Sequence, residues 1–124
     1  QNIKAIQLKG QRFYNDIEQI PGFEFPCGFP KAGFYLFIQI DKLYQAIINL
    51  NKSDEGSKGE VVAHYMLENF DLAVVPGTGF GPGFDSFIRV SFVLSESELA
   101  QAAQRFKLVS DSVFHNQNNT QISF

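Results

Sequence analysis

Two short apolar segments, in which residues alternate between two faces, constrain the fold more than any other feature of this chain. They are "GFYLFIQI", residues 33–40, and "SFIRVSFV", residues 86–93. Because successive side chains of a β-strand point to opposite faces of the sheet, each segment has one aliphatic face and one mixed face. The alternation predicts two strands of one small sheet, with the aliphatic faces directed at a common core.

Segments with helical periodicity surround these strands. Apolar residues recur at steps of three or four over residues 2–20, from about 59 to 69, and from residue 95 onward. Asp41 is predicted to cap a shorter helix over 41–50, and Ser95 with Glu98 has the spacing of a capping box. Further short strands are expected at 23–30 and 72–75. Helices and strands are partly segregated along the chain, which predicts an α+β fold, a two-layer sandwich with helices on one face of a small, mainly antiparallel sheet.

The length of 124 residues corresponds to one domain. We expect this domain to occupy residues 1–109. Residues 110–124 are rich in Asn, Gln and Ser and are expected to form a polar, mobile tail. The chain begins with Gln1 rather than Met, which suggests a piece of a longer protein, with processing of the N-terminus as the alternative.

Charge and composition exclude several classes of function. A net charge of −3 and a pI near 5.3 argue against nucleic-acid binding, and no apolar run approaches the length of a membrane span. The single cysteine, Cys27, cannot form an internal disulfide and has no metal-ligand spacing around it, so a cytoplasmic location is expected. His64 and His115 have no partner at ligand spacing, so a zinc site is not expected. Ser95 has no base beside it and is better explained as a helix cap.

The second face of the predicted sheet is unusually aromatic. Phe87 and Arg89 share the face opposite the core, and Tyr35 and Phe37 join them if both strands lie in one sheet. A free-standing domain would normally place Lys, Glu and Thr there, so such a patch indicates a face that is covered by something else. The alternative is that the aromatics are scattered and that Arg89 is a solvated strand residue.

The segment "VVPGTGFGPGFDSFIRVSF", residues 74–92, has four glycines at alternate positions from 77 to 83. A dinucleotide-binding loop would require a third glycine where Pro82 or Phe84 stands, and it would lead into a helix rather than a strand. No G-K-[ST] follows, which excludes a P-loop. The glycines let the backbone turn tightly with Phe80 at the tip, near Arg89, whose planar fork suits a carboxylate.

These residues resemble a known family. "DLAVVPGTGFGPGFDSFIRVSFVLSESELAQAAQRF", residues 71–106, resembles the C-terminal part of class I/II aminotransferases, the fold-type I pyridoxal-phosphate enzymes. The shared features are a Pro-Gly loop, a strand with a central arginine, and a helix start that is typically S-x-E-E-L in the family and reads S-E-S-E-L here. Residues 20–40 are similar to the family's preceding strand pair, and residues 2–20 to the end of the helix that links its two domains. The resemblance covers about residues 2–109.

The resemblance implies roles for several residues. Arg89 matches the arginine that grips the substrate α-carboxylate, and Phe80 matches a residue that lines the mouth of the active site. Tyr35 and Phe37 would lie on the face turned toward the family's large domain. The Schiff-base lysine and the groups that hold the cofactor belong to that large domain. No matching motif surrounds the lysines considered for the Schiff-base role, which are Lys31, Lys42, Lys52 and Lys58.

Two hypotheses follow. In the first, the chain is the C-terminal small domain of a cytoplasmic, homodimeric aminotransferase. It would bind an amino acid or 2-oxo acid and close over pyridoxal phosphate held by the large domain of the same enzyme, without binding the cofactor or transaminating alone. In the second, the chain is a stand-alone α+β binding or regulatory module that takes up a small carboxylate or a protein partner on its aromatic face.

Overall fold

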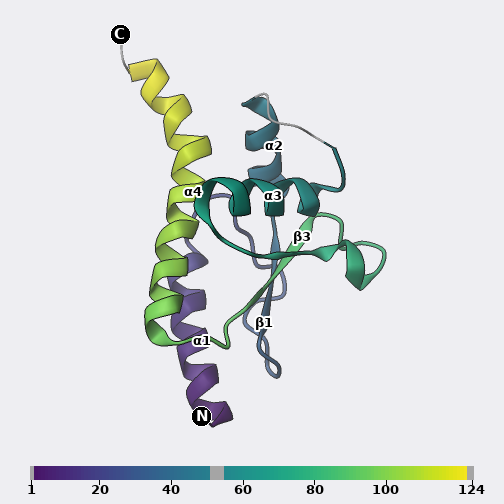
Figure 1. The fold of residues 1–124 in the computed structure, drawn as a ribbon, viewed down its shortest axis with the longest axis vertical. Helices are drawn as coiled ribbons and strands as arrows, with labels where there is room; N and C mark the ends of the chain where they lie inside the picture. The colour runs from purple at the N-terminus through teal and green to yellow at the C-terminus, as the bar shows by residue number, and fades with distance from the viewer. Residues whose placement is uncertain (1, 51–54, 123–124) are drawn as a thin grey trace.

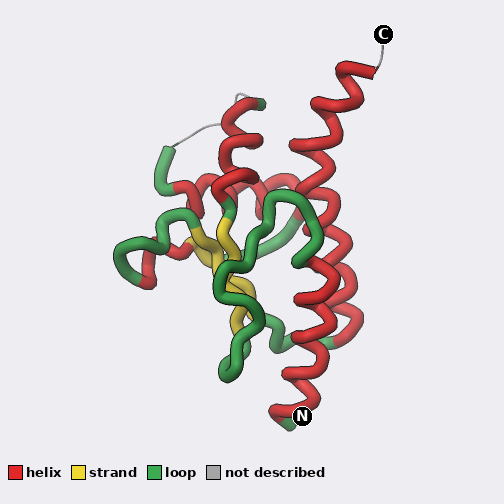
Figure 2. Tube along the Cα trace, turned by 180° about the vertical axis from the view of Figure 1, so that it is seen from behind, coloured by secondary structure: helices red, strands yellow, loops and turns green. Residues whose placement is uncertain are grey.

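The helices and strands follow one another in an α+β order. The computed structural model describes residues 2–50 and 55–122, with side chains as far as Phe114. Its elements are α1 (Ile3–Ile17), β1 (Tyr35–Gln39), α2 (Asp41–Asn49), α3 (Lys58–Phe70), β2 (Val75–Pro76), the 3₁₀ turn η1 (Gly77–Phe80), β3 (Phe87–Ser91) and α4 (Glu96–Ile122). Helices α1 and α4 lie side by side along one edge of the molecule, and η1 projects on the opposite side (Figure 1 and Figure 2).

The sheet is small, antiparallel and centred on β3. The strand order is β1-β3-β2, so β3 pairs with a strand on each side. Arg89 lies opposite Phe37 of β1 and opposite Val75 of β2. This arrangement confirms the predicted α+β fold with a mainly antiparallel sheet. The predicted strand at 86–93 is shortened to Phe87–Ser91, and the one at 33–40 to Tyr35–Gln39.

One face of the sheet packs into the hydrophobic core. The residues predicted on the aliphatic face of β1 and β3 are buried, including Leu36, Ile38 and Ile88, none of which is exposed. Phe106 of α4 meets Phe13 of α1 edge-on, with ring centroids 6.0 Å apart. Burial of this apolar surface is the main stabilising contribution, at roughly 25 cal/mol per Å².

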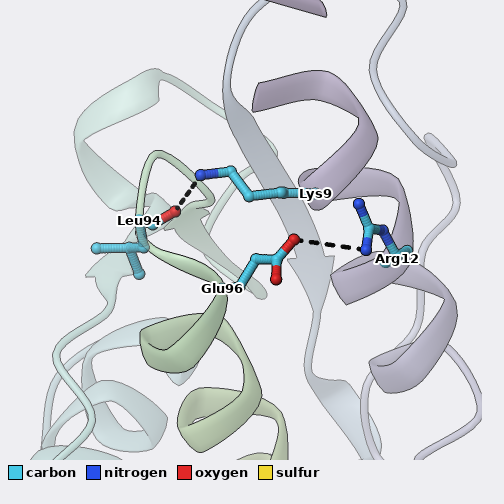
Figure 3. Close-up of polar contacts among 4 residues, drawn as sticks. All are labelled: Lys9, Arg12, Leu94 and Glu96. Carbon is cyan, nitrogen blue, oxygen red and sulfur yellow. Dashed lines mark hydrogen bonds and ion pairs between the residues drawn. The ribbon is translucent and has the colours of Figure 1, made fainter. Parts of the chain in front are cut away.

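Polar contacts also join α1 to the start of α4. The Lys9 ammonium donates to the carbonyl oxygen of Leu94 at 3.1 Å, and Arg12 pairs with Glu96 at 3.5 Å (Figure 3). The side chains of Arg12 and Glu96 are both about two-thirds exposed. Exposed pairs of this kind contribute about 0–1 kcal/mol, so the apolar contacts between the helices dominate.

Helix capping matches the sequence prediction at one helix and contradicts it at another. Ser95 and Glu98 form the expected capping box before α4, with each side chain accepting from the other's backbone N–H. The prediction that Asp41 caps α2 is wrong. Ile40 occupies the cap position without a side-chain bond, and Asp41 begins the helix and accepts a hydrogen bond from Lys58 of α3 at 2.9 Å. This tertiary partner, 17 residues away, replaces the local cap.

Two predicted strands are largely absent from the part of the chain that is described. The segment 23–30 contributes a single isolated bridge, from Glu24 to Gln39. The prolines at 26 and 30 lack the N–H that a longer ladder would need. The strand expected at 72–75 begins only at Val75, because the chain leaves α3 through Asp71 in the left-handed conformation, with φ of 55°.

Helix α4 is longer than the sequence analysis expected. It continues past residue 109 to Ile122, and its C-terminal end extends beyond the other elements (Figure 1). Val113 belongs to the core, and Phe114 packs against it. The packed structure therefore reaches at least Phe114, while the proposed division into residues 1–109 and a mobile tail stays a prediction.

Candidate functional site

The sheet face turned away from the core carries an aromatic cluster around one cation. Arg89 alternates along β3 with the buried Ile88 and Val90, so its side chain leaves the sheet on the other side. Tyr35 is 43% exposed and Phe80 37%, and the remaining aromatics are half-buried. We refer to this surface as the open face, which consists of Tyr35, Phe37, Val75, Phe80, Phe84, Phe87 and Arg89.

The Arg89 guanidinium lies close to two aromatic rings. Its central carbon is 4.2 Å from the ring centroid of Tyr35 and 4.7 Å from that of Phe80. Tyr35 comes from β1 and Phe80 from η1, which follows β2, and β3 lies between these two strands. The ring of Phe80 also packs against that of Phe37, with centroids 5.7 Å apart. Both rings lie close enough to the guanidinium to attract it as a cation.

The guanidinium keeps its hydrogen-bond donors available. Within residues 2–50 and 55–122, Arg89 makes no hydrogen bond or ion pair, whereas Arg12 pairs with Glu96 and Arg105 with Asp71. A guanidinium carries five N–H donors in a planar fork that matches a carboxylate in a two-point contact. Among the described residues, the open face therefore presents one unpaired cation in an apolar surround, which is an arrangement suited to an anionic ligand.

Glycines shape the loop that carries Phe80. A Cβ built on Gly77 would lie 2.3 Å from the carbonyl oxygen of Phe84, so no larger residue fits there without a backbone shift. Gly81 and Gly83 have φ of 115° and 91°, a region that other residues rarely adopt. Here the glycines serve close backbone packing and tight turning, and the loop leads into β3 as the sequence analysis expected.

The N-terminus of α3 contacts this loop through hydrogen bonds. The backbone N–H of Gly59 donates to the carbonyl oxygen of Asp85 at 2.8 Å. The hydroxyls of Ser57 and Thr78 lie 3.3 Å apart. Ser57 also forms a capping box with Glu60 that the sequence analysis missed, although its S-x-x-E spacing could have predicted it. These contacts link the loop to the helical layer.

Two members of the open face were not identified from the sequence. Phe84 lies 6.0 Å from Phe37 and 5.6 Å from Phe87, centroid to centroid. Val75 lies directly opposite Arg89 and is exposed. Strand alternation could have placed Val75 only if the register between β2 and β3 had been known.

The structure also describes several other residues considered from the sequence. His64 pairs with Glu68 one turn along α3, and Cys27 is exposed and not disulfide-bonded. Lys42 pairs with Glu24. Lys52 and the His115 side chain lie outside the described residues. The described part of the chain contains no group of three His, Cys, Asp or Glu suited to a metal ion and no helix both long and apolar enough to cross a membrane.

Sequence comparison relates the chain to aminotransferases. No protein-family model matches it. The probable aspartate/prephenate aminotransferase of Rickettsia prowazekii is 33% identical over 112 residues, which cover 86% of this chain and 25% of that protein. The aspartate/prephenate aminotransferase of Nitrosomonas europaea is 30% identical over 105 residues, which cover 83% of this chain and 25% of that protein. The chain thus spans about a quarter of the length of these relatives.

Solved structures share the fold. The aspartate aminotransferase from Rhizobium meliloti superposes with a TM-score of 0.67 at 25% identity, over 87% of this chain and 26% of that one. An alanine aminotransferase from Pyrococcus furiosus superposes with a TM-score of 0.70 at 21% identity, over 88% and 24%, which is a likeness of fold alone. The sequence relatives and the shared fold show that the chain belongs to the fold-type I pyridoxal-phosphate aminotransferases.

Proposed function

We propose that this chain is the small domain of an aminotransferase and binds the α-carboxylate of an amino acid or 2-oxo acid through Arg89. The observation that carries the proposal is the Arg89 guanidinium on the open face, which has no hydrogen-bond or ion-pair partner among the described residues and lies within 4.7 Å of the ring centroids of Tyr35 and Phe80. A two-point contact would orient the substrate by its carboxylate, and the surrounding rings would exclude water as the domain closes. Phe80 would lie beside the bound substrate, at the mouth of the site.

The cofactor belongs to another part of the parent enzyme in this proposal. When bound, pyridoxal phosphate supplies the electron sink for transamination and requires a lysine for its covalent attachment. The open face contains no lysine, and Lys58, on the neighbouring α3, is bonded to Asp41. The residues present therefore do not fit the cofactor. The partner of the open face would be the large domain of the same enzyme, in a cytoplasmic homodimer.

The test is substitution of Arg89 in the intact enzyme that contains this segment. Arg89→Ala should raise KM for amino acids by orders of magnitude, because a charge-assisted two-point contact worth roughly 2–4 kcal/mol is lost. Arg89→Lys should recover only part of this affinity, since lysine keeps the charge but not the fork. Arg105→Ala is the control, because Arg105 donates to the backbone of Asp71 instead. An unchanged KM for Arg89→Ala would refute the proposal.

A second measurement addresses the assignment of the cofactor to another domain. Pyridoxal phosphate added to the isolated chain should give no site-specific aldimine absorbance, because the required lysine is missing from the open face. An aldimine that one lysine substitution abolishes would contradict the assignment of the cofactor to another domain.

A further inference from the structure

We propose that Thr78 is a positioning residue, whose hydroxyl group pairs with that of Ser57 and keeps the ring of Phe80 beside Arg89. As a role in the enzyme this inference rests on the proposed function, because Phe80 and Arg89 belong to the same site. The contact itself lies within this chain and can be measured without any ligand. It gives the first turn of α3 a part in arranging the open face.

The loop between β2 and β3 is anchored at both ends. At the first end, Gly77 is buried, and a Cβ built on it would lie 2.3 Å from the carbonyl oxygen of Phe84. At the second end, the carbonyl oxygen of Asp85 accepts a hydrogen bond from the backbone N–H of Gly59 at 2.8 Å. Between these anchors, residues 78–83 form a segment that we call the strap.

The backbone of the strap is largely open to its surroundings. A Cβ built on Gly79, Gly81 or Gly83 would have no heavy atom within 4 Å beyond those of its chain neighbours. Thr78 and Phe80 are exposed, and η1 projects away from α1 and α4 (Figure 1). Because backbone packing does not fix the strap, the position of Phe80 depends on side-chain contacts.

Two side chains of the strap contact the rest of the protein. The ring of Phe80 packs edge-on against that of Phe37, with centroids 5.7 Å apart, and its centroid lies 4.7 Å from the guanidinium carbon of Arg89. The hydroxyl oxygen of Thr78 lies 3.3 Å from that of Ser57. In a 3₁₀ turn, side chains two residues apart point in different directions, so both contacts form at once.

Ser57 is itself held in place by the helix that it caps. Its hydroxyl accepts a hydrogen bond from the backbone N–H of Glu60 at 3.1 Å, and the Glu60 carboxylate accepts one from the backbone N–H of Ser57 at 2.9 Å. The next residue, Lys58, donates to Asp41 of α2 at 2.9 Å. The Ser57 hydroxyl retains a proton and a second lone pair for Thr78, so either oxygen can donate.

A single hydrogen bond between neutral groups biases the strap without locking it. Such a bond shifts an equilibrium by about two- to ten-fold. Here the favoured state has the Phe80 ring beside Arg89, so part of the ordering of the site precedes ligand binding. Loss of the Thr78 hydroxyl should weaken ligand binding by a similar factor, which is far less than the effect expected for loss of Arg89.

Nuclear magnetic resonance of the isotope-labelled chain, without ligand, tests the contact. A nuclear Overhauser effect between the Phe80 ring and the Arg89 side chain reports the favoured state. Thr78→Val keeps the branched shape but not the hydroxyl, and it should at least halve this effect. It should also lower the order parameters of the Gly79 and Phe80 amides toward those of flexible backbone, below about 0.6. Thr78→Ser keeps the hydroxyl and should preserve both signals.

The two capping serines provide a matched control. Ser57→Ala removes a capping box together with the partner of Thr78, so it should act like Thr78→Val. Ser95→Ala removes the corresponding box before α4, which Ser95 forms with Glu98, and should leave the Phe80 signals unchanged. An equal effect of the two alanine variants would mean that loss of a helix cap is sufficient to move the strap, which would overturn the proposal.

Kinetics of the intact enzyme test the positioning role. Thr78→Val should raise KM about two- to ten-fold with kcat nearly unchanged, and Thr78→Ser should restore KM. A merely structural loss would lower the amount of active enzyme, and hence the apparent kcat, without this change in KM. If Thr78→Val leaves either the Phe80 signals or KM unchanged, the positioning role is refuted, whereas carboxylate binding is tested separately by Arg89→Ala.

Discussion

A Cβ built on Gly59 would lie 2.6 Å from the carbonyl oxygen of Phe87, so the first turn of α3 packs directly on the backbone that leads into Arg89. Alanine is favoured over glycine in a helix by about 1 kcal/mol. Here the neighbour is backbone and cannot move without displacing β3, so the clash should dominate. We expect Gly59→Ala to lower the free energy of unfolding by about 1–3 kcal/mol, measured by urea denaturation.

Gly79→Ala is the matched control for this prediction. Gly79 lies in η1, has no atom within 4 Å of a built Cβ, and does not have a positive φ. Its substitution should change stability by less than about 0.5 kcal/mol. Equal losses for the two variants would mean that close packing at Gly59 is not the cause.

A hydrogen bond between Tyr65 and Ser112 joins α3 to α4. The two hydroxyl oxygens are 2.8 Å apart in a half-buried position, and Ser112 also donates to the carbonyl oxygen of Val109. Tyr65→Phe should lower stability by about 1 kcal/mol. In a double-mutant cycle with Ser112→Ala, the coupling energy should be about 0.5 kcal/mol or more, and simple additivity would contradict a direct bond.

Ser110 carries a buried hydroxyl group that has no hydrogen-bond partner among the described residues. It is 1% exposed, and its oxygen has no hydrogen-bond partner among the described residues. Removing an unsatisfied buried polar group avoids its desolvation cost, so Ser110→Ala should raise the melting temperature, with a gain of roughly 1 kcal/mol. The exposed Ser97 lies in the same helix, and Ser97→Ala measures the part due to helix propensity. A gain no larger than that of Ser97→Ala would refute the explanation.

The free energy of unfolding should fall at acidic pH because the glutamates of the two capping boxes, Glu98 and Glu60, become protonated. Hydrogen bonds from the backbone N–H of Ser95, and then from its side chain, lower the pKa of Glu98 below its ordinary value of 4.5. Because the folded state binds this proton less readily than the unfolded state, the contribution is present above about pH 4.5. It is lost as the pH falls through the lowered pKa of the folded state. The pKa of Glu60 is lowered in the same way by Ser57.

Urea unfolding between pH 3 and 7 checks this effect. Glu98→Gln should be less stable than the wild type at neutral pH, and the difference should shrink toward pH 3. Combining Glu98→Gln with Glu60→Gln should further reduce the loss of stability between pH 7 and pH 3. A difference that stays constant across this range would contradict the assignment to ionised caps.

Local patterns were sufficient for much of the candidate site. Strand alternation alone placed Arg89 and Tyr35 on the face away from the core, because the two-residue period of a strand leaves no other choice once Ile88 is buried. The capping box at Ser95 could also be predicted from local sequence, because both partners lie within one helical turn. The assignment of Asp41 failed because its partner, Lys58, is remote in sequence.

The sequence by itself determined the class of fold, the two faces of its main strands and the presence of one arginine amid aromatic rings. Only the tertiary structure decided that the rings of Phe80 and Tyr35 both lie within 4.7 Å of that guanidinium and that Phe84 and Val75 complete the open face. The physical reason is the separation in sequence between the residues that interact. Strand period and helix caps depend on neighbours a few residues apart. The order β1-β3-β2 and the path of the glycine loop depend on packing between segments tens of residues apart.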